Sequence, residues 1–374
     1  MIGENITKML QNNDNHITAE FLDKAQLLPK NSPFYNGKKL LTMKDLNGNT
    51  PEIFLCTTNR SGGKTTYFNH MAVEYFKATG KKFVLEYRYN GDVKKCEDKF
   101  FKDIGTLFYP DSVVSGKYIA NGKFRMIYID GVHCGYGLAI NQLDDIKRSS
   151  HLFSDAGIII NDEFQSEQNK YLPDEIKNFI SVHNSLARGG GHMSRYLPVI
   201  CIGNCITMLN PYYVALGISD RLRSDTKFLR GNGFVLEQGF IQAAADAQKD
   251  SLFNQAFSNE DYVKFSQENV YLNDDYSFID RPQGASEYVA TFVYNRTEYA
   301  IREYIKQGFM YVNRKIDSSF PIRISATTDD LRPNYLMLKQ NNLMIQTLKT
   351  YFQHGCFRFN DLKSKSATLH LLSY

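Results

Sequence analysis

Long hydrophobic runs are missing from this sequence. No stretch of its 374 residues approaches the ~20 consecutive apolar residues that span a bilayer. The N-terminus, MIGENITKML, lacks the apolar core of a secretory signal peptide. We therefore expect a cytosolic protein that has no membrane partner. Internal repeats and low-complexity tracts are absent from the sequence as well.

Cysteine and histidine patterns typical of disulfide frameworks or zinc sites are also missing. None of the six cysteines forms C-x-x-C, and several lie inside apolar runs, so we interpret them as reduced, buried thiols. The eight histidines show no metal-ligand spacing, which argues against a structural zinc site.

A strong charge of one sign is absent, because the formal net charge is only +4. This value neither requires nor excludes a polyanionic partner, since a nucleic-acid-binding protein depends on local basic patches. Tryptophan is absent, but hydrophobic residues make up 43% of the chain. A chain of this length and composition can build two or three domains with substantial cores.

A phosphate-binding loop is present, although its first glycine is missing. The segment LCTTNRSGGKTTYFNHM (55–71) fits the pattern G-x-x-x-x-G-K-[ST] at Gly63, Lys64 and Thr65, while Thr58 replaces the first glycine. A threonine costs little there if its φ is negative, and Gly62 keeps the backbone freedom beside the phosphates. We expect these residues to contact the nucleotide: Thr58, Asn59, Arg60, Ser61, Gly62, Gly63, Lys64, Thr65 and Thr66.

The context of this loop is the strand–loop–helix arrangement that a phosphate cradle requires. IFLCTT (53–58) predicts a buried strand, and TTYFNHMAVEYFKATG predicts the helix whose N-terminus would face the anion. Lys64 would reach the β- and γ-phosphates, and Thr65 would bind Mg²⁺. Taken alone, GGKTT is equally compatible with a glycine-rich turn before a helix.

Two further apolar strands end in polar residues suited to ATP hydrolysis. AGIIINDEF (156–164) ends in Asp162, a candidate Mg²⁺ ligand, and Glu163, a candidate base that polarises the attacking water. VICIGN ends in Asn204, which could sense the γ-phosphate, although a plain strand-end turn explains it equally well. Together the three features predict a site that hydrolyses ATP with Mg²⁺, of the ASCE group of P-loop ATPases.

Two cations are candidates for action across a subunit interface. Arg188 follows the helix predicted over 173–187 and precedes three glycines. We expect it near the edge of the nucleotide crevice, where it suits an arginine finger inserted into a neighbour's site. Lys147 precedes the strand at 156–164 and could also face a neighbour. Simple solvent exposure is the alternative for both.

The order of predicted elements indicates an α/β protein with several domains. Short apolar strands alternate with helices up to about residue 235, which favours a mostly parallel sheet covered on both faces. Alternating segments, EYVATFVYN, EYAIREYI, GFMYVNRKI and PIRISATT, then suggest an antiparallel meander. We predict an N-terminal extension (1–48), a RecA-like ATPase domain (49–235), a small helical linker (236–272) and an α+β domain (273–374).

The chain resembles the genome-packaging ATPases of phi29-like phages, well over residues 50–215 and weakly over the last 40. The matching segments are TTNRSGGKTT, FVLEYRYNGD, IIINDEF…YLPDEIKNFISVHNSLARGGG, ICIGNCITMLNPYYV and TYFQHGCFRFND. The run from the DEF strand through P-[DN]-E to Arg188 is the most specific part. Thr58 departs from the family's leading glycine, and the N-terminal extension has no counterpart.

The resemblance implies a homopentameric ring at the portal of an empty procapsid, which threads double-stranded DNA inward with ATP and Mg²⁺. A packaging RNA is a further candidate partner. By position, Lys64 and Thr65 match Walker A, Asp162 and Glu163 match Walker B, and Arg188 matches the trans-acting finger.

Lys147 aligns with a second lysine that acts across the interface. The location implied is the host cytoplasm at the procapsid and not the mature virion.

The resemblance also implies that the last domain has the RNase H-like fold of terminase nucleases. Its first strand, EYVATFVYNRTEYA, has no central aspartate, and Asp329 and Asp330 lie in a turn-like segment. We therefore expect an inactive nuclease. Two alternatives to a packaging motor are a helicase-like translocase and a nucleotide-binding scaffold, and Glu163 argues against the scaffold.

Overall fold

The computed structural model describes residues 16–372 except 30, 169, 189–192, 208–209, 219–220, 223–225, 261–262, 264–277, 280–281, 326 and 338–342. The chain divides into two compact units, residues 1–273 and 274–374, which are described separately. Within the helical linker expected over 236–272, residues 261–262 and 264–272 lie outside the described residues. Among the described residues, no helix is long and apolar enough to span a bilayer.

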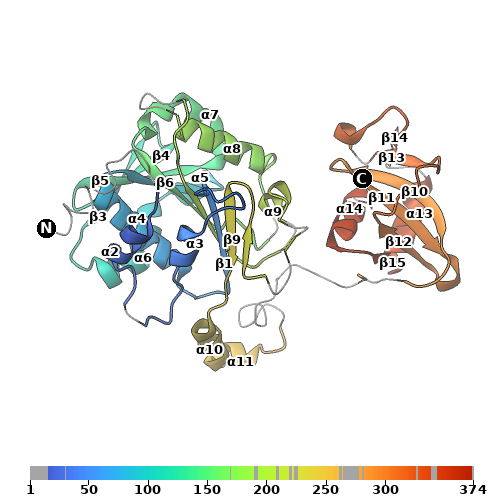
Figure 1. Cartoon of the computed structure of the whole chain (residues 1–374), viewed down its shortest axis with the longest axis horizontal. Coiled ribbons are helices and arrows are strands. Elements are labelled where there is room, and N and C mark those ends of the chain that lie inside the picture. Colours follow the sequence, from blue (N-terminus) through green and yellow to red (C-terminus); the bar gives the residue numbers. More distant parts are fainter. Residues whose placement is uncertain are drawn as a thin grey trace. The chain divides into compact units, whose positions relative to one another are not determined.

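The first unit is built on a nine-stranded sheet in the order β3-β4-β5-β2-β6-β7-β1-β9-β8 (Figure 1). The strands from β5 to β9 in this order run parallel, and antiparallel β4, β3 and β8 extend the two edges. The mostly parallel sheet expected from the sequence is therefore confirmed. The strands are β1 (Ile53–Thr58), β2 (Lys82–Tyr87), β3 (Val114–Ile119), β4 (Phe124–Ile129), β5 (Val132–Ala139), β6 (Ala156–Asp162), β7 (Val199–Asn204), β8 (Phe228–Arg230) and β9 (Phe234–Gln238).

Helices cover both faces of this sheet. Successive side chains of a strand point to opposite faces, so the burial of β6 from Ala156 to Asn161 requires cover on both sides. α4 contacts α2 and α6, whereas α8 contacts α7 and α9. The helices are α2 (Ala19–Ala25), α3 (Lys38–Thr42), α4 (Lys64–Thr79), α5 (Asn90–Val93), α6 (Cys96–Phe108), α7 (Leu143–Arg148), α8 (Glu175–Leu186), α9 (Pro211–Ala215), α10 (Gln242–Asp250) and α11 (Leu252–Ala256), with short 3₁₀ turns at Ile140–Gln142 and Ser150–Phe153.

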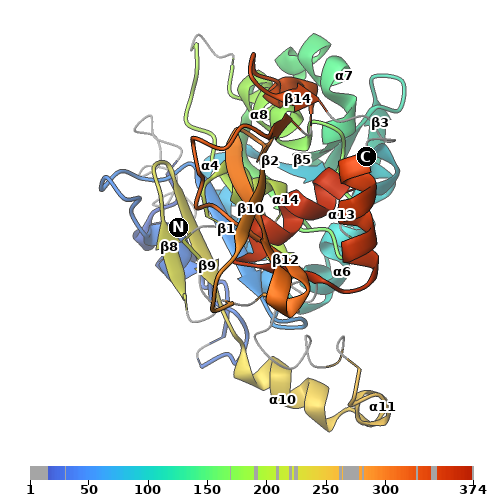
Figure 2. The ribbon, with the colours of Figure 1, turned by 90° about the vertical axis from the view of Figure 1, so that its right-hand side faces the viewer.

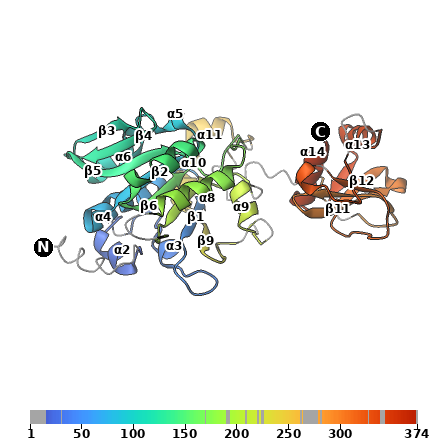
Figure 3. The same cartoon turned by 90° about the horizontal axis from the view of Figure 1, so that it is seen from above.

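The N-terminal segment belongs to the core of this unit. α2 lies beside α4 (Figure 3), and Phe21 and Leu40 are buried in the same apolar cluster as the central strands. The Tyr35 hydroxyl donates a 2.6 Å hydrogen bond to Glu237 Oε2 on β9. The residues that we expected to form an extension therefore pack as part of the first unit from residue 16 onward.

The second unit is an α+β domain on a six-stranded sheet in the order β14-β13-β10-β11-β12-β15. α13 and α14 pack against each other (Figure 2), and both contribute buried residues to the core of this unit. Its elements are β10 (Glu287–Tyr294), β11 (Thr297–Tyr304), β12 (Phe309–Asn313), β13 (Arg323–Ser325), β14 (Leu336–Met337), α13 (Leu343–Gln353), β15 (Phe357–Phe359) and α14 (Leu362–Leu372), with short 3₁₀ turns at Ile305–Gln307 and Thr328–Asp330.

The predicted antiparallel meander is correct for three strands and wrong for the fourth. β10, β11 and β12 pair antiparallel in succession, but β13 pairs parallel with β10 on the far side of the sheet. The reason is the long connection over residues 314–322, which carries the chain across the sheet where a hairpin would need a tight turn.

The cysteines are free, as the sequence predicts. Five of the six are buried, and Cys356 is only half-buried. Burial raises the pKa of the Cys96 and Cys134 thiols to about 12, so both are protonated at neutral pH.

Candidate nucleotide site

The candidate site lies where β1, β6 and β7 end. β7 lies between the other two strands, with Thr58 level with Asn204 and Asp162 level with Ile202. The three strands run parallel, so the polar residues that follow them meet at one edge of the sheet. The Lys64 ammonium donates a 2.7 Å hydrogen bond to Asn204 Oδ1. Residues that are 140 positions apart in the chain therefore form one site.

A polar cavity of about 340 Å³ opens at this edge. Its lining includes Arg60, Lys64, Thr65, Asp162, Glu163 and Asn204, which unites the predicted Walker residues with the predicted sensor. Ser61, Gly62, Gly63 and Thr66 line a neighbouring cavity, while Thr58 and Asn59 are buried beneath the loop.

Thr58 is accommodated without backbone strain. It is the last paired residue of β1 and is not among the residues with positive φ, so the extended backbone accepts a β-branched side chain. Its hydroxyl donates a 2.9 Å hydrogen bond to the Asn59 carbonyl. The condition under which a threonine is expected to cost little at this position, a φ that is not positive, is therefore met.

The two remaining glycines are each required for a different reason. Gly63 has a φ of 82°, in the left-handed region that favours glycine. A Cβ on Gly62 would come within 2.8 Å of the Ile241 side chain. Ser61 also has a positive φ of 62°, so the loop stores some strain at a non-glycine residue.

Two distant segments anchor the loop, and no pattern in the sequence predicts either contact. The buried Asn59 side chain donates to the Ile241 carbonyl at 3.1 Å and accepts from the Ile241 amide at 2.9 Å. From the N-terminal side, the Tyr35 amide donates to the Gly62 carbonyl at 2.8 Å. The loop conformation therefore depends on residues outside the Walker motif.

Burial shifts the pKa values of two groups that line the cavity, the Lys64 ammonium and the Asp162 carboxyl. Lys64 is only 8% exposed, and desolvation lowers the pKa of its ammonium although Asp162 and Cys56 nearby oppose this shift. Desolvation also raises the pKa of Asp162, with the Lys99 ammonium opposing the shift. A phosphate beside Lys64 and a cation beside Asp162 would stabilise the ionised form of each group.

Glu163 lies immediately after β6 in a left-handed conformation, with a φ of 62°. Its amide donates a 3.0 Å hydrogen bond to Asp162 Oδ1, and its side chain is 75% exposed. Lys99 Nζ lies 3.7 Å from Glu163 Oε1. A non-glycine residue in this conformation costs about 1–3 kcal/mol and persists where its surroundings enforce it.

The surroundings that enforce it are a buried ion pair that the sequence did not identify. Arg88, directly after β2, donates to both carboxylate oxygens of Glu175 at 2.9–3.1 Å. The same guanidinium donates to the carbonyls of Phe164 at 2.9 Å and Glu163 at 3.4 Å. Glu175 is 2% exposed and also accepts from the Tyr212 hydroxyl at 3.0 Å.

We name these two residues the Arg88–Glu175 clamp. The matching segments of the resemblance include EYR, which ends in Arg88, and P-D-E, which ends in Glu175. No pattern in the sequence indicates that these two segments contact each other.

Arg188 does not lie near the edge of its own crevice, so that expectation is wrong. α8 starts at Glu175, one of the two clamp residues, and its twelve residues extend about 18 Å toward the opposite edge of the sheet. There the Ala187 carbonyl accepts from the Arg195 amide, and the Arg195 guanidinium bonds to the carbonyl of Ala156, the first residue of β6. The physical reason is that a helix connecting parallel strands returns the chain to the start of the next strand.

Lys147 lies in the last turn of α7 and is exposed. α7 and α8 pack together (Figure 1), and both return the chain to the starting edge of the sheet. Arg188 is therefore exposed at the edge where the parallel strands start, opposite the nucleotide loop, whereas Lys147 is exposed on α7, which packs beside α8. Neither residue lines either cavity at the site.

Comparison with known proteins identifies the family of this chain. The family model described as podovirus DNA encapsidation protein (Gp16) matches residues 30–373. The chain belongs to this family. The DNA packaging protein of Bacillus phage PZA is 24% identical to this family member over 334 residues, which cover 88% of this chain and 94% of the relative. The DNA packaging protein of Bacillus phage phi29 is 23% identical over 334 residues, with the same coverage of both chains.

The fold of this encapsidation-family protein matches a solved motor subunit. A chain of the bacteriophage phi29 viral genome packaging motor assembly superposes with a TM-score of 0.65 at 20% identity, covering 91% of this chain and 99% of the other. The similarity extends over both units, so the α/β architecture with a second sheet domain is a property of the whole relative.

Proposed function

We propose that this chain is the ATP-hydrolysing subunit of a homopentameric ring that drives viral double-stranded DNA into a preformed procapsid. The ring would act at the portal vertex in the host cytoplasm, bound to the portal directly or through a packaging RNA, and would be absent from the mature virion. The observation that carries the proposal is the meeting of Lys64, Asp162 and Asn204 at one sheet edge, in a chain of a DNA encapsidation family.

The donor set of the polar cavity fits Mg²⁺. The Thr65 hydroxyl and the Asp162 carboxylate line the same cavity, and both supply the oxygen ligands that this cation prefers. The cation would neutralise charge on the β- and γ-phosphates. Lys64 would bind the same phosphates, and the amides of the loop and of the start of α4 would donate to them.

Glu163 would accept a proton from the water that attacks the γ-phosphate. Its carboxylate is exposed beside the cavity, and the Arg88–Glu175 clamp fixes the turn from which it projects. Asn204, hydrogen-bonded to Lys64, is placed to respond when a γ-phosphate occupies the cavity.

A ring would complete each site with a neighbour's cations. Glu163 is largely exposed after the end of β6, whereas Arg188 is exposed near the start of this strand and Lys147 is exposed on α7. Head-to-tail packing brings such opposite surfaces together and closes into a ring. Arg188 would then insert into the neighbouring nucleotide site as an arginine finger, and Lys147 would support it.

The second unit would serve in docking and not in DNA cleavage. A two-metal nuclease needs several carboxylates that converge on ions ~3.5–4 Å apart. The Asp330 carboxylate is buried and accepts hydrogen bonds from three donors, whereas Asp329 is exposed. This arrangement supports a structural role for the pair.

The decisive experiment measures ATP turnover by purified full-length protein with empty procapsids and duplex DNA, added separately and together. We expect the highest rate with both components, and no stimulated turnover in Lys64→Ala. Equal stimulation by single-stranded DNA without procapsids would favour the helicase-like alternative. Nucleotide binding without turnover under any of these conditions would favour a scaffold.

A further inference from the structure

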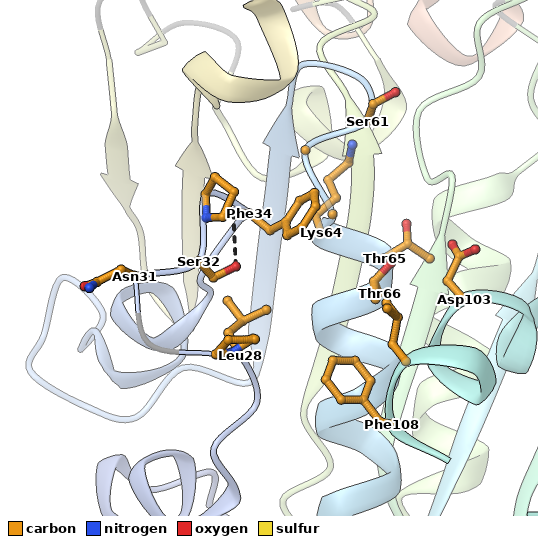
Figure 4. Close-up of a pocket in the computed structure, with 15 residues that line it drawn as sticks. Leu28, Asn31, Ser32, Phe34, Ser61, Lys64, Thr65, Thr66, Asp103 and Phe108 are labelled. Atoms are coloured by element: carbon orange, nitrogen blue, oxygen red, sulfur yellow. Dashed lines mark hydrogen bonds between the residues drawn. The ribbon is translucent and has the colours of Figure 1, made fainter. Parts of the chain in front are cut away.

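The two ends of the parallel strands carry different parts of the proposed mechanism. Figure 4 shows Ser61 and Lys64 of the phosphate loop, which follows the end of β1. Arg188 is exposed near the opposite end of the strands, two residues after the last residue of α8. A finger that acts on another subunit must be aimed by its own subunit, so the residues that hold this end of α8 bear on catalysis in the neighbour.

The side chain of Arg195 joins three backbone segments at this end of the sheet. Its guanidinium donates to the carbonyls of Leu186 at 2.9 Å and Phe153 at 3.3 Å, and also to the carbonyl of Ala156. Leu186 is the last residue of α8, Phe153 ends the 3₁₀ turn that follows α7, and Ala156 begins β6. One guanidinium therefore connects a helix, a turn and a strand.

The backbone beside this side chain closes a stem beneath Arg188. The Arg195 amide donates a 3.0 Å hydrogen bond to the Ala187 carbonyl. One turn earlier in α8, the His183 imidazole donates a 2.9 Å hydrogen bond to the Leu197 carbonyl. The end of α8 is therefore bonded to the segment that leads into β7, and Arg188 projects from a stem whose two sides are joined.

A guanidinium suits this bracing task because it presents several donors in a rigid plane and stays charged. The Arg195 side chain is half-buried, and desolvation lowers its pKa, while Tyr75 and Asp155 nearby oppose this shift. All three residues whose carbonyls accept its bonds are buried. Removal of the guanidinium would leave these carbonyls without a donor that they now have, which loosens the end of α8.

We propose that Arg195 is a positioning residue for the trans-acting finger, because it fixes the end of α8 from which Arg188 projects toward a neighbour's nucleotide site. The proposal rests on the proposed function of Arg188. Arg195 lines neither cavity at the nucleotide site of its own subunit. Its loss should therefore impair the finger that a subunit gives and spare the site at which the subunit receives one.

The first test measures ATP turnover by the full-length variants with procapsids and duplex DNA. Arg195→Ala should lower stimulated turnover about 10²-fold, the cost of a misplacement of about 1 Å, and should leave ADP affinity unchanged. Arg195→Lys keeps the charge but cannot bond to three carbonyls in one plane, so its turnover should fall between those of Arg195→Ala and the wild type.

Two mixtures of variants then separate giving a finger from receiving one. Arg195→Ala mixed with Glu163→Gln should regain activity comparable to that of Arg188→Ala mixed with Glu163→Gln, because the Glu163→Gln subunit supplies a well-placed finger to an intact site. Arg195→Ala mixed with Arg188→Ala should regain none, because neither subunit supplies such a finger. A merely structural defect would instead damage the site of the Arg195→Ala subunit and prevent the first recovery.

Arg221→Ala is a matched control for the loss of an arginine that braces the backbone. The Arg221 guanidinium also donates to a carbonyl, that of Arg230 at 2.6 Å, but this carbonyl belongs to the last residue of β8. Arg221→Ala should keep the wild-type stimulated turnover. Circular dichroism and sedimentation check fold and assembly, and Arg195→Lys replaces Arg195→Ala in the mixtures if the latter does not fold.

Wild-type stimulated turnover in Arg195→Ala would overturn the inference, and so would activity regained by mixing it with Arg188→Ala. No recovery with Glu163→Gln, while the reference mixture of Arg188→Ala and Glu163→Gln recovers, would show a structural role and also overturn it. Failure of the reference mixture itself would contradict the action of Arg188 in trans, which is the part of the proposed function on which the inference rests.

Discussion

Two adjacent acidic pairs in this chain have opposite surroundings. Asp162 and Glu163 follow a buried parallel strand and face a polar cavity, with Glu163 held in a left-handed turn. Asp329 and Asp330 lie in a short 3₁₀ turn of the second unit. The Asp330 carboxylate accepts from the amides of Asn295 and Arg296 at 2.8 Å each and from the Thr327 hydroxyl at 2.9 Å.

The difference shows that the partners of a carboxylate decide its chemistry. The oxygens of Asp330 are occupied by donors from the β10–β11 turn, where Asn295 and Arg296 both have positive φ. The Asp162 carboxylate accepts one hydrogen bond, from the Glu163 amide, and it lines the same cavity as Thr65. The first pair therefore presents both carboxylates to one cavity, whereas in the second pair the Asp330 oxygens are occupied and Asp329 is exposed. The predictions below test this contrast, from the largest expected effect to the smallest.

ATP turnover at the site of one subunit should depend on the Arg188 guanidinium of a neighbouring subunit. Arg188→Ala should lower stimulated ATP turnover by about 10³–10⁵-fold with little change in nucleotide affinity, because a finger acts on charge that develops in the transition state. Steady-state turnover and ADP titration separate these two effects. Unchanged stimulated turnover would contradict the finger assignment and make Lys147 the next candidate.

Mixing two inactive variants tests whether Arg188 acts on a neighbour. An Arg188→Ala subunit keeps its own Glu163, and a Glu163→Gln subunit keeps its own finger. Where the two adjoin in a ring, one interface contains a complete site, so the mixture should regain part of the activity. No recovery at any ratio, with assembly confirmed by sedimentation, would count against action in trans.

Glu163→Gln should reduce turnover by about 10²–10⁴-fold, because the amide keeps the shape of the side chain but cannot accept the proton. ADP affinity should remain at the wild-type level, since Lys64 and the loop are untouched. Turnover is measured as phosphate release, and circular dichroism checks the fold. A variant that loses its fold would instead show that Glu163 is structural.

The sequence predicted the parts of the site that depend on local pattern. Strand–loop–helix order, the apolar strand before Asp162 and the polar strand end at Asn204 are all periodic signals. The position of Arg188 depends on the direction in which α8 runs back across the parallel sheet, which a local pattern does not encode. The contacts of Asn59 with Ile241 and of Arg88 with Glu175 join distant segments, and no spacing within a single sequence encodes such pairs.

The Arg88–Glu175 clamp should affect turnover without affecting nucleotide affinity. Arg88→Ala frees the turn that carries Glu163, and a misplacement of about 1 Å can cost ~10²-fold in rate. Arg88→Lys should recover only part of the rate, because an ammonium cannot reproduce the planar fork that binds Glu175 and both carbonyls. Phosphate release and ADP titration are the measurements. A parallel loss of ADP affinity would indicate a general structural role.

Asp330→Ala should produce a local loss of stability and no loss of catalysis. The substitution removes the charged acceptor of the Asn295 and Arg296 amides, and the loss of these hydrogen bonds costs about 1–3 kcal/mol. Hydrogen exchange of the β10–β11 amides in the full-length protein should therefore accelerate, while ATP turnover stays at the wild-type rate. The matched control, Asp329→Ala, removes an exposed carboxylate from the same turn and should leave both unchanged.

Mg²⁺- or Mn²⁺-dependent nicking of duplex DNA by the wild type, lost in Asp330→Ala, would reverse the contrast between the two acidic pairs. The carboxylate would then have to release its amide partners to bind a metal ion, and the exchange rates of these same amides would report that release.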